Sequence, residues 1–535
     1  MKHFFLYIIG VVVCTAATAQ AQRAGDSPWR KLQIAEFAIT NLYVDTVDER
    51  RLVEEAIIDM LAQLDPHSTY SNAEEVRKMN EPLQGNFEGI GVQFQMMDDT
   101  LLVIQPVRGG PSEKVGILAG DRIIAVGDTA IAGVRMPVDD ITGRLRGPKG
   151  TDVQLTIVRR GVDGTLPFTV KRDKIPIYSL DASYLIRPGI GYIRINRFGA
   201  TTPKEFLTAL QALQKEGMRD LILDLQGNGG GYLEAAIDLA NEFLGSKELI
   251  VYTQGRKEPR KEFYSKGSGR LRHGRLVVLV DEFSASASEI VTGAIQDWDR
   301  GVVVGRRTFG KGLVQRPIPL PDHSMIRLTV ARYYTPAGRC IQKPYTHRRG
   351  GDDKAYDREL IERFNRGEMM HADSIHFPDS LKYATLKLHR TVYGGGGIMP
   401  DVFVPIDTTQ STPYLRQLAA RGLILQTATK YIEQHRQALK AQYTRFEAFE
   451  QQFEVDEPLL SALREAADRA KITFEATQYH TSLPWIKRQL KALIARDLWD
   501  LNEFFRIVNT DDECVQKALE LLTGDSYSQM LSEKK

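Results

Sequence analysis

Two short segments of this 535-residue chain carry side chains that could act together as a nucleophile and its base. Ser286 lies among small residues in FSASASE, and Lys311 lies between two glycines in FGKG. A serine hydroxyl is a weak nucleophile at neutral pH and needs an adjacent base. Histidine is the usual base, but no histidine lies in a comparable motif. A lysine can serve instead, because burial disfavours its charged form and lowers its pKa.

The residues around Ser286 predict the start of a helix. Small neighbours leave the serine Oγ accessible, and the free N–H groups of a helix start can face an oxyanion. Two alternatives stay open from these residues alone. The segment could be only a helix start capped by serines, or Ser284 or Ser288 could be the nucleophile. Lys311 could likewise be a solvated surface lysine.

A glycine-rich loop (QGNGGG, residues 226–231) follows an apolar run at residues 221–225. The run predicts a buried strand, and glycines after it let the backbone approach a substrate and turn N–H groups inward. A phosphate loop is an alternative. However, neither a GK[ST] ending nor a GxGxxG pattern is present, so nucleotide binding is not expected.

Composition excludes several functional classes. The chain has 70 Lys+Arg and 68 Asp+Glu, a net charge of +2, which gives no support for nucleic-acid binding. Hydrophobic residues make up 42%, as in ordinary globular proteins. Three cysteines cannot build a disulfide framework, and no CxxC or HExxH motif points to zinc. A structural zinc or a zincin site therefore has no support, and a mechanism with a serine nucleophile and a lysine base would need neither a metal nor an organic cofactor.

The N-terminus has the pattern of a secretory signal peptide. Lys2 supplies the positive charge, residues 4–13 are apolar, and alanines at A-x-A spacing offer cleavage sites near residue 21. The apolar run is about half the roughly 20 residues that a spanning helix needs. We expect export to the periplasm with cleavage of residues 1–21, and the alternative is retention as a short anchor.

The rest of the chain alternates between helical and β-like patterns. The pattern predicts a mixed α/β protein in which a β-rich domain precedes a core of alternating strands and helices. The expected parts are an N-terminal helical region (22–84), the β-rich domain (85–175), the core (176–348), a polar insertion (349–388), the end of the core (389–406) and a C-terminal helical extension (407–535).

Several motifs in one order carry a family resemblance: GIGV, GPSEKVGILAGDRIIAVGD, LILDLQGNGGG, SASASE and TFGKGLVQ. Over about residues 30–406 the chain resembles the carboxy-terminal processing, or tail-specific, serine proteases. The resemblance implies an α/β core of the crotonase/Clp-like kind, with a PDZ domain inserted as the β-rich part. The glycine loop departs from the pattern, since many relatives have a proline or an arginine there.

The resemblance assigns roles residue by residue. It implies a dyad of Ser286 and Lys311, with Gln315, four residues past the lysine, helping to orient it. The oxyanion hole would be the backbone N–H of Ala287 together with that of Gly229 or Gly230. Asp297 is a candidate for an acidic residue of the site, or else a solvated charge at a helix end. Gln315 could also be an ordinary polar residue, and Glu289 is expected on a helix face near the site.

The PDZ resemblance predicts how a substrate is recognised. The loop that would bind a terminal carboxylate consists of Gly89, Ile90, Gly91 and Val92. Consecutive backbone N–H groups capture the carboxylate, and the peptide adds as a strand to an open edge. The alternative is a PDZ-like spacer without a ligand.

These predictions together describe a serine endopeptidase that cleaves near free, apolar C-termini of exported proteins. The resemblance leaves room for an adaptor lipoprotein, for peripheral association with the inner membrane and for a homo-oligomer. The alternative function is a non-catalytic tail-binding chaperone or scaffold of the periplasm. Such a protein could lose its serine or its lysine, whereas both Ser286 and Lys311 are present.

Overall fold

The computed structural model describes residues 28–345 and 355–532. The predicted signal peptide lies outside these residues. The chain divides into two compact units. The first comprises the residues up to Glu74 with 315–329 and 345–356, and the second comprises the remaining segments.

The first unit contains two helices and a small sheet. The helices are α2 (Pro28–Leu42) and α3 (Glu49–Ala62), which confirms the helical pattern of this region. Asp48 caps α3 by accepting a hydrogen bond from the N–H of Arg51. The short strand β1 (Thr69–Ser71) pairs antiparallel with the part of β18 (Met325–Tyr334) that belongs to this unit. Strand β17 (Leu313–Pro319) also pairs with β18.

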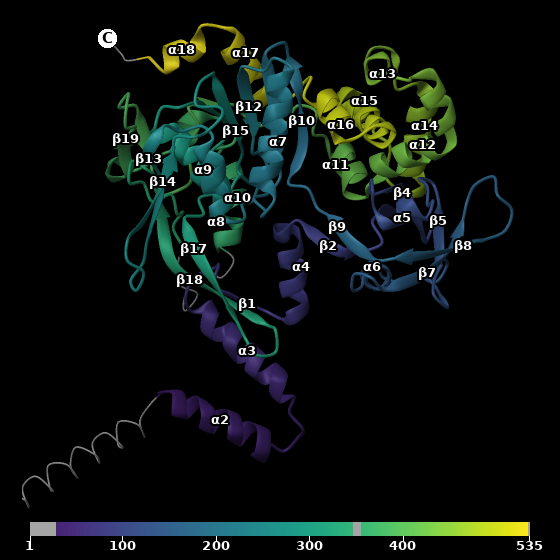
Figure 1. The fold of residues 1–535 in the computed structure, drawn as a ribbon, viewed down its shortest axis with the longest axis horizontal. Coiled ribbons are helices and arrows are strands. Elements are labelled where there is room, and N and C mark those ends of the chain that lie inside the picture. The colour runs from purple at the N-terminus through teal and green to yellow at the C-terminus, as the bar shows by residue number, and fades with distance from the viewer. Residues whose placement is uncertain (1–27, 346–354, 533–535) are drawn as a thin grey trace, which may run out of the picture. The chain divides into compact units, whose positions relative to one another are not determined.

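The β-rich domain lies in the second unit, after helix α4 (Ala73–Gln84), and appears in blue in Figure 1. Its sheet has the order β3-β4-β5-β7-β8, with β6 paired to β5. A separate ribbon joins β2 to β9. The elements are β2 (Asn86–Gly89), β3 (Val92–Met97), β4 (Thr100–Pro106), α5 (Pro111–Lys114), β5 (Arg122–Val126), β6 (Thr129–Ala130), α6 (Val138–Leu145), β7 (Asp152–Val158), β8 (Leu166–Lys171) and β9 (Asp173–Pro176).

The α/β core is built on a six-stranded sheet of order β10-β11-β12-β15-β16-β21. Strands β10 and β11 are antiparallel, and the other neighbours are parallel. Side chains of β12 and β15 alternate between two apolar clusters, one on each face. The elements are β10 (Leu180–Arg187), β11 (Ile190–Ile195), α7 (Thr202–Lys215), β12 (Asp220–Asp224), α8 (Leu233–Asn241), β13 (Ser246–Gln254), β14 (Lys261–Lys266), β15 (Leu276–Val280), α9 (Ala287–Asp297), β16 (Val302–Gly305) and β21 (Val402–Phe403).

Three helices of the core, α7, α8 and α9, cover one face of this sheet. Helix α9 is buried along its whole length. The predicted insertion contains α10 (Ala355–Asn365), two 3₁₀ turns and the strand β19 (Lys382–Ala384), which pairs with β20 (Thr391–Tyr393). The late strand of the core forms as β21, parallel to β16. The mixed α/β class is therefore confirmed.

The C-terminal region is helical, as predicted. Its first six helices enclose a separate apolar cluster, and the last two pack on the second face of the core sheet. The helices are α11 (Pro413–Ala420), α12 (Leu423–Gln442), α13 (Phe446–Gln452), α14 (Glu457–Arg469), α15 (Ala476–Leu498), α16 (Leu501–Val508), α17 (Glu513–Thr523) and α18 (Ser526–Met530). None of the helices in the described ranges has both the length and the apolar composition needed to cross a bilayer.

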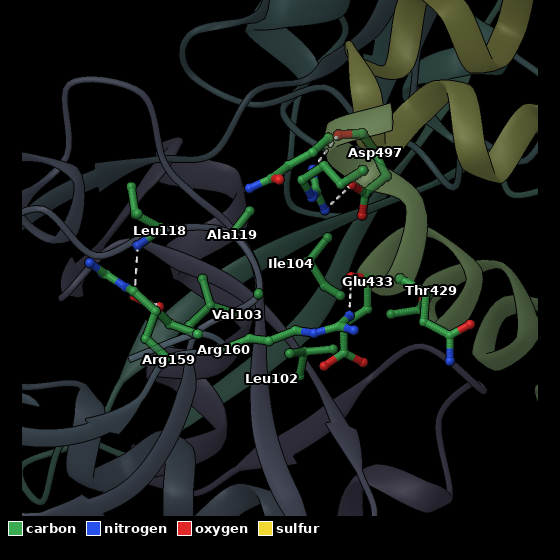
Figure 2. Close-up of a pocket in the computed structure, with 16 residues that line it drawn as sticks. Leu102, Val103, Ile104, Leu118, Ala119, Arg159, Arg160, Thr429, Glu433 and Asp497 are labelled. Atoms are coloured by element: carbon green, nitrogen blue, oxygen red, sulfur yellow. Dashed lines mark hydrogen bonds and ion pairs between the residues drawn. The ribbon is translucent and has the colours of Figure 1, made fainter. Parts of the chain in front are cut away.

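Helix α12 contacts the β-rich domain directly. Arg122 of β5 forms an ion pair with Glu433 at 2.8 Å, and Thr429 Oγ1 lies 3.2 Å from Gln95 Oε1 of β3. A cavity of about 550 Å³ remains between these elements, and its lining residues are drawn in Figure 2. Its lining contains none of the predicted site residues, so this cavity is an interface feature and not the candidate active site.

Candidate active site

The candidate nucleophile lies at the junction between β15 and α9. Ser286 is half-buried, and its backbone has φ 56° and ψ −110°. A non-glycine residue rarely adopts positive φ, and such strain concentrates at functional sites. Because Ser286 immediately precedes α9, its side chain stands where the helix presents free N–H groups.

A buried carboxylate, Asp281, shapes the turn that leads to Ser286. Its Oδ1 accepts hydrogen bonds from the N–H groups of Phe283 and Ser284, both at 3.0 Å. The same carboxylate accepts from the N–H of Gly227, at 2.9 and 3.0 Å from its two oxygens. Burial raises the pKa of Asp281. One side chain therefore fixes both the nucleophile turn and the start of the glycine loop.

The hydroxyls of the two alternative nucleophiles, Ser284 and Ser288, donate hydrogen bonds to backbone carbonyls. Ser284 is buried, and its hydroxyl donates to the carbonyl of Leu225 at 2.8 Å. Ser288 is also buried, and its hydroxyl donates to the carbonyl of Asn228 at 2.8 Å. Both hydroxyls hold the glycine loop against the turn, so Ser286 is the better candidate of the three.

Glu289 joins the segment around Ser286 (residues 283–289, the serine segment) to the segment around Lys311 (residues 307–312, the lysine segment). Its Oε2 accepts from the N–H groups of Ser286 and Lys311, at 2.8 and 2.9 Å. Its Oε1 accepts from the Thr308 hydroxyl at 2.6 Å and from the Gly310 N–H at 2.7 Å. The residue is fully buried, and burial raises its pKa to about 7, although these hydrogen bonds act in the opposite direction. The backbones of Ser286 and Lys311 are thus held close together.

Two further contacts tie the lysine segment to the serine segment. The N–H of Phe309 donates to the carbonyl of Ser284 at 3.0 Å. The hydroxyl of Tyr333, a buried residue of β18, donates to the carbonyl of Ser286 at 3.1 Å and also to that of Lys311. The structure therefore brings together the two residues that were predicted to form the dyad.

The glycine loop lies directly against Ser286. A β-carbon on Gly230, which has φ +99°, would come within 2.8 Å of Ser286 Cβ and 3.0 Å of the Ala287 N. The Gly230 N–H donates to Asn228 Oδ1 at 2.9 Å, so it is not directed at an oxyanion. Of the two glycines predicted for the oxyanion hole, Gly229 is therefore the better candidate. Ala287 begins α9 beside the loop, as expected.

An arginine from a neighbouring strand holds the start of the glycine loop. Arg194 of β11 donates to the carbonyl of Gln226 at 2.8 Å and forms an ion pair with Asp224. The guanidinium carbon lies 5.0 Å from the ring centre of Phe505, in the C-terminal helix α16. The loop lacks an arginine of its own, but a guanidinium from β11 contacts it. The C-terminal region is thereby in contact with a residue that supports the site.

Asp297 is not brought to the dyad. It ends α9, about 16 Å along the helix from Ser286 at the usual rise per residue. Its carboxylate is fully buried, pairs with Arg339 at 2.5 Å and accepts from the Ala337 N–H at 2.8 Å. Asp297 is thus not a solvated charge, because it is buried and Arg339 compensates its charge. Its position at the far end of α9 also keeps it away from Ser286. Gln315 lies half-buried on β17, four residues past Lys311.

The predicted carboxylate loop lies between β2 and β3. Ile90 is buried, and its carbonyl accepts from the Ser112 hydroxyl at 2.7 Å. Gly91 has φ +73°, and a β-carbon there would lie 2.8 Å from Ile175 Cδ1. Val92 begins β3, which stands first in the sheet order and pairs with β4 among the described strands. The loop with Gly89 therefore precedes an edge strand, as a peptide-binding PDZ loop requires.

Two supporting residues, Asp281 and Arg194, were missed from the sequence. Glu289 was expected near the site, but its bridging role was not predicted. Glu289 had a local signal, because serine followed three residues later by glutamate is a capping-box pattern. Asp281 also had one, since aspartate after a strand often forms a turn with its own backbone. Arg194 had none. Within the described ranges no cluster of His, Cys, Asp and Glu could hold a metal ion.

Comparison with known proteins relates this geometry to a family. A model of peptidase family S41 matches residues 189–347. A carboxy-terminal-processing protease of Bartonella bacilliformis is 35% identical over 354 residues, which cover 64% of this chain and 80% of the relative. The chain belongs to the carboxy-terminal processing proteases of peptidase family S41. It is therefore a serine-type protease, as predicted, and the non-catalytic alternative has no support.

A second curated relative of this protease agrees with that assignment. The carboxy-terminal processing protease CtpA of Bacillus subtilis is 36% identical over 355 residues, covering 64% of this chain and 75% of the relative. A solved photosystem II D1 C-terminal processing protease has a TM-score of 0.36 and 27% identity, covering 72% of this chain and 88% of that chain.

Further models match the flanking parts of this protease. A PDZ domain matches residues 89–170, and the N-terminal domain of the activating protease CtpB matches residues 12–75. A family of unknown function matches residues 414–500. The predicted PDZ domain is thus confirmed. The family model that matches the C-terminal helical region assigns no function to it.

Proposed function

We propose that this protease cleaves peptide bonds with a dyad of Ser286 and Lys311. The observation that carries the proposal is the Glu289 carboxylate, whose Oε2 accepts from the backbone N–H of both residues. Two residues far apart in sequence are held together by one buried atom, and one of them has strained backbone. A serine with an adjacent lysine is a known form of activated nucleophile.

In the proposed mechanism, neutral Lys311 takes the proton from Ser286 Oγ. The oxygen attacks the peptide carbonyl carbon, and the carbonyl oxygen becomes an oxyanion that accepts from the N–H groups of Ala287 and Gly229. The C–N bond then breaks, and Lys311 gives its proton to the leaving amine. Lys311 next takes a proton from water, which attacks the acyl carbon. The bond to Ser286 Oγ then breaks as Lys311 gives that proton to Oγ, which restores the hydroxyl and the neutral lysine. Gln315 is proposed to orient the lysine.

We also propose that the PDZ domain binds free, apolar C-terminal tails. The edge strand β3 supports this, together with an apolar set in which Phe94 and Met96 of β3 pack on a cluster that includes Ile141 and Leu145 of α6. A peptide added to β3 could place its side chains against this set while its carboxylate binds the loop that precedes the strand. Cleavage would then follow near the C-terminus of exported proteins.

The test uses one unstructured fluorogenic reporter that ends in Val-Ala-Ala, either as the free acid or as the amide. The full chain, Ser286→Ala, Lys311→Ala and Ser284→Thr are compared at neutral pH. We expect cleavage of the free-acid reporter only, with losses of at least about a thousandfold in Ser286→Ala and Lys311→Ala. Ser284→Thr keeps a hydroxyl at a structural position and serves as the matched control.

Each part of the proposal has its own contrary outcome. Full activity of Ser286→Ala or Lys311→Ala would refute the dyad. Equal cleavage of the acid and the amide would keep the dyad and remove the role of the terminal carboxylate. Cleavage only of reporters with charged tails would refute the preference for apolar C-termini.

We propose that the protease is exported and acts in the periplasm. The support is the positive N-terminus, the apolar run at residues 4–13 and the A-x-A spacing near residue 21. Sequencing the N-terminus of protein recovered from the periplasmic fraction tests the proposal. A new terminus near residue 22 is expected, and an intact Met1 in the cytoplasmic fraction would contradict it.

We propose a homo-oligomer formed through the first unit. Large apolar side chains of α2 are exposed, including Trp29 at 64%, Ile34 at 61% and Phe37 at 63%. An exposed apolar patch of this kind marks an interaction surface, and a second copy offers the same patch. Light scattering of the full chain should give a multiple of the monomer mass, and Phe37→Asp should lower it. A monomer in the wild type would refute the proposal. An adaptor lipoprotein and association with the inner membrane stay predictions.

A further inference from the structure

The predicted insertion carries a buried arginine that faces the lysine segment. Arg363 lies on α10 and is 1% exposed. Its Nη2 donates to the carbonyl of Arg307 at 2.7 Å, and its Nη1 donates to the carbonyl of Thr308 at 3.2 Å. These carbonyls lie four and three residues before Lys311. Arginine side chains are seldom fully buried unless their donors are paired. The burial of Arg363 therefore indicates that the insertion packs against the core at this point.

Several further contacts connect the same segment to the insertion and to Lys343. Arg307 pairs with Glu368 at 2.6 Å and with Glu359 at 3.4 Å. Glu359 also pairs with Lys343 at 3.1 Å, and the Lys343 ammonium lies 4.1 Å from the ring centre of Phe309. The N–H of Lys343 donates to the carbonyl of Gly310 at 2.8 Å. Every residue from 307 to 310 is therefore held, directly or through one partner, by α10 and its surroundings.

The other side of this segment faces the candidate site. The Thr308 hydroxyl and the Gly310 N–H both donate to Glu289 Oε1, and the next N–H, that of Lys311, donates to Oε2. A shift of the backbone at Thr308 would alter all three distances, since these donors lie within four consecutive residues. A misplacement of about 1 Å is enough to cost about a hundredfold in rate.

We propose that Arg363 is a positioning residue for the base Lys311, and that the insertion braces the lysine segment against Glu289. The inference rests on the proposed Ser286–Lys311 dyad. Arg363 does not touch the reacting atoms. It acts through two backbone carbonyls, whose positions determine where the chain delivers the lysine.

The experiment measures kcat and KM of full-length Arg363→Met and Arg363→Lys with the free-acid reporter. Methionine fills a similar volume but removes both donors, and lysine keeps a donor that reaches one carbonyl. We expect kcat to fall about 10- to 100-fold in Arg363→Met with KM within about twofold, and Arg363→Lys to recover part of the loss. Glu362→Gln, on the same helix but half-exposed, is the control and should keep the wild-type kcat.

A folded Arg363→Met protein with wild-type kcat would overturn the proposal, and so would a change confined to KM. If Arg363→Met does not fold, Arg363→Lys decides: a kcat at least threefold below wild type supports positioning, and an unchanged kcat refutes it. Lys311→Ala is measured in parallel. Should Lys311→Ala stay active, the proposed dyad fails, whatever Arg363 does. If Lys311→Ala is inactive and the Arg363 variants are unimpaired, only the positioning role fails.

Discussion

The backbone N–H groups of Ser286 and Lys311 donate to one and the same atom, Oε2 of Glu289, at 2.8 and 2.9 Å. This relationship links a helix start to a loop that follows the next strand. The relative positions of Ser286 and Lys311 therefore depend on a single buried carboxylate that is not part of the candidate dyad.

Replacing Glu289 by glutamine should therefore damage activity more than its distance from the chemistry suggests. The amide presents N–H groups where the carboxylate presents an acceptor, so two of four donors lose their partner. We expect a loss of about 2–4 kcal/mol in the free energy of unfolding and about a hundredfold in kcat. Urea denaturation and reporter cleavage measure the two effects.

Glu234→Gln is the control for that substitution, because Glu234 is an exposed glutamate in the first turn of α8. It should change neither quantity appreciably. A Glu289→Gln protein with wild-type kcat would show that the bridge does not position the dyad.

The raised pKa of Glu289 predicts a pH dependence of stability. Its pKa rises from 4.5 to about 7 on folding, so the folded state binds this proton more tightly than the unfolded state. The stabilisation is complete below about pH 4.5 and is lost as pH rises through about 7, by about 3 kcal/mol in total. Wild type should therefore lose stability relative to Glu289→Gln across this range. Parallel curves of unfolding free energy against pH for the two proteins would contradict the prediction.

Two adjacent glycines should respond in opposite ways to alanine. Gly230→Ala forces a β-carbon against Ser286 and Ala287 at positive φ, whereas the site of a β-carbon on Gly229 has no heavy atom within 4 Å. We expect Gly230→Ala to lower kcat at least about a hundredfold. Gly229→Ala keeps its N–H in place and should stay within about threefold of wild type. Similar kcat values for the two variants would mean that contact between the loop and the nucleophile does not matter.

The carboxylate loop offers a matched pair of a different kind. Gly91→Ala combines positive φ with a β-carbon 2.8 Å from Ile175, whereas Gly116 has similar φ and open space around it. In a Ser286→Ala background, Gly91→Ala should weaken binding of a free-tail peptide at least about tenfold, and Gly116→Ala should not. Fluorescence anisotropy with a labelled peptide measures the affinity. Unchanged binding by Gly91→Ala would separate this loop from tail recognition.

Local patterns carried most of what the sequence could predict. Ser286 and Lys311 lie in short motifs, and the strands and helices around them have clear periodicity. Asp297 shows the limit: its partner Arg339 lies on a distant segment, and nothing near Asp297 in sequence indicates that it is buried. Arg194 and Arg363 were missed for the same reason, since each acts on backbone carbonyls that carry no residue-specific signal. Glu289 had a pattern of its own, but its second set of donors came from the lysine segment.

Helix α17 has a consequence for biogenesis. Its buried residues, with Val515 and Leu522 among them, complete the apolar layer over Val277 and Leu279 of the central strand β15. Because α17 is synthesised some 230 residues after β15, a nascent chain keeps one face of its catalytic sheet in water. Such a face favours chaperone binding over folding. Synthesis order thus delays the appearance of a working protease until its last helices are available.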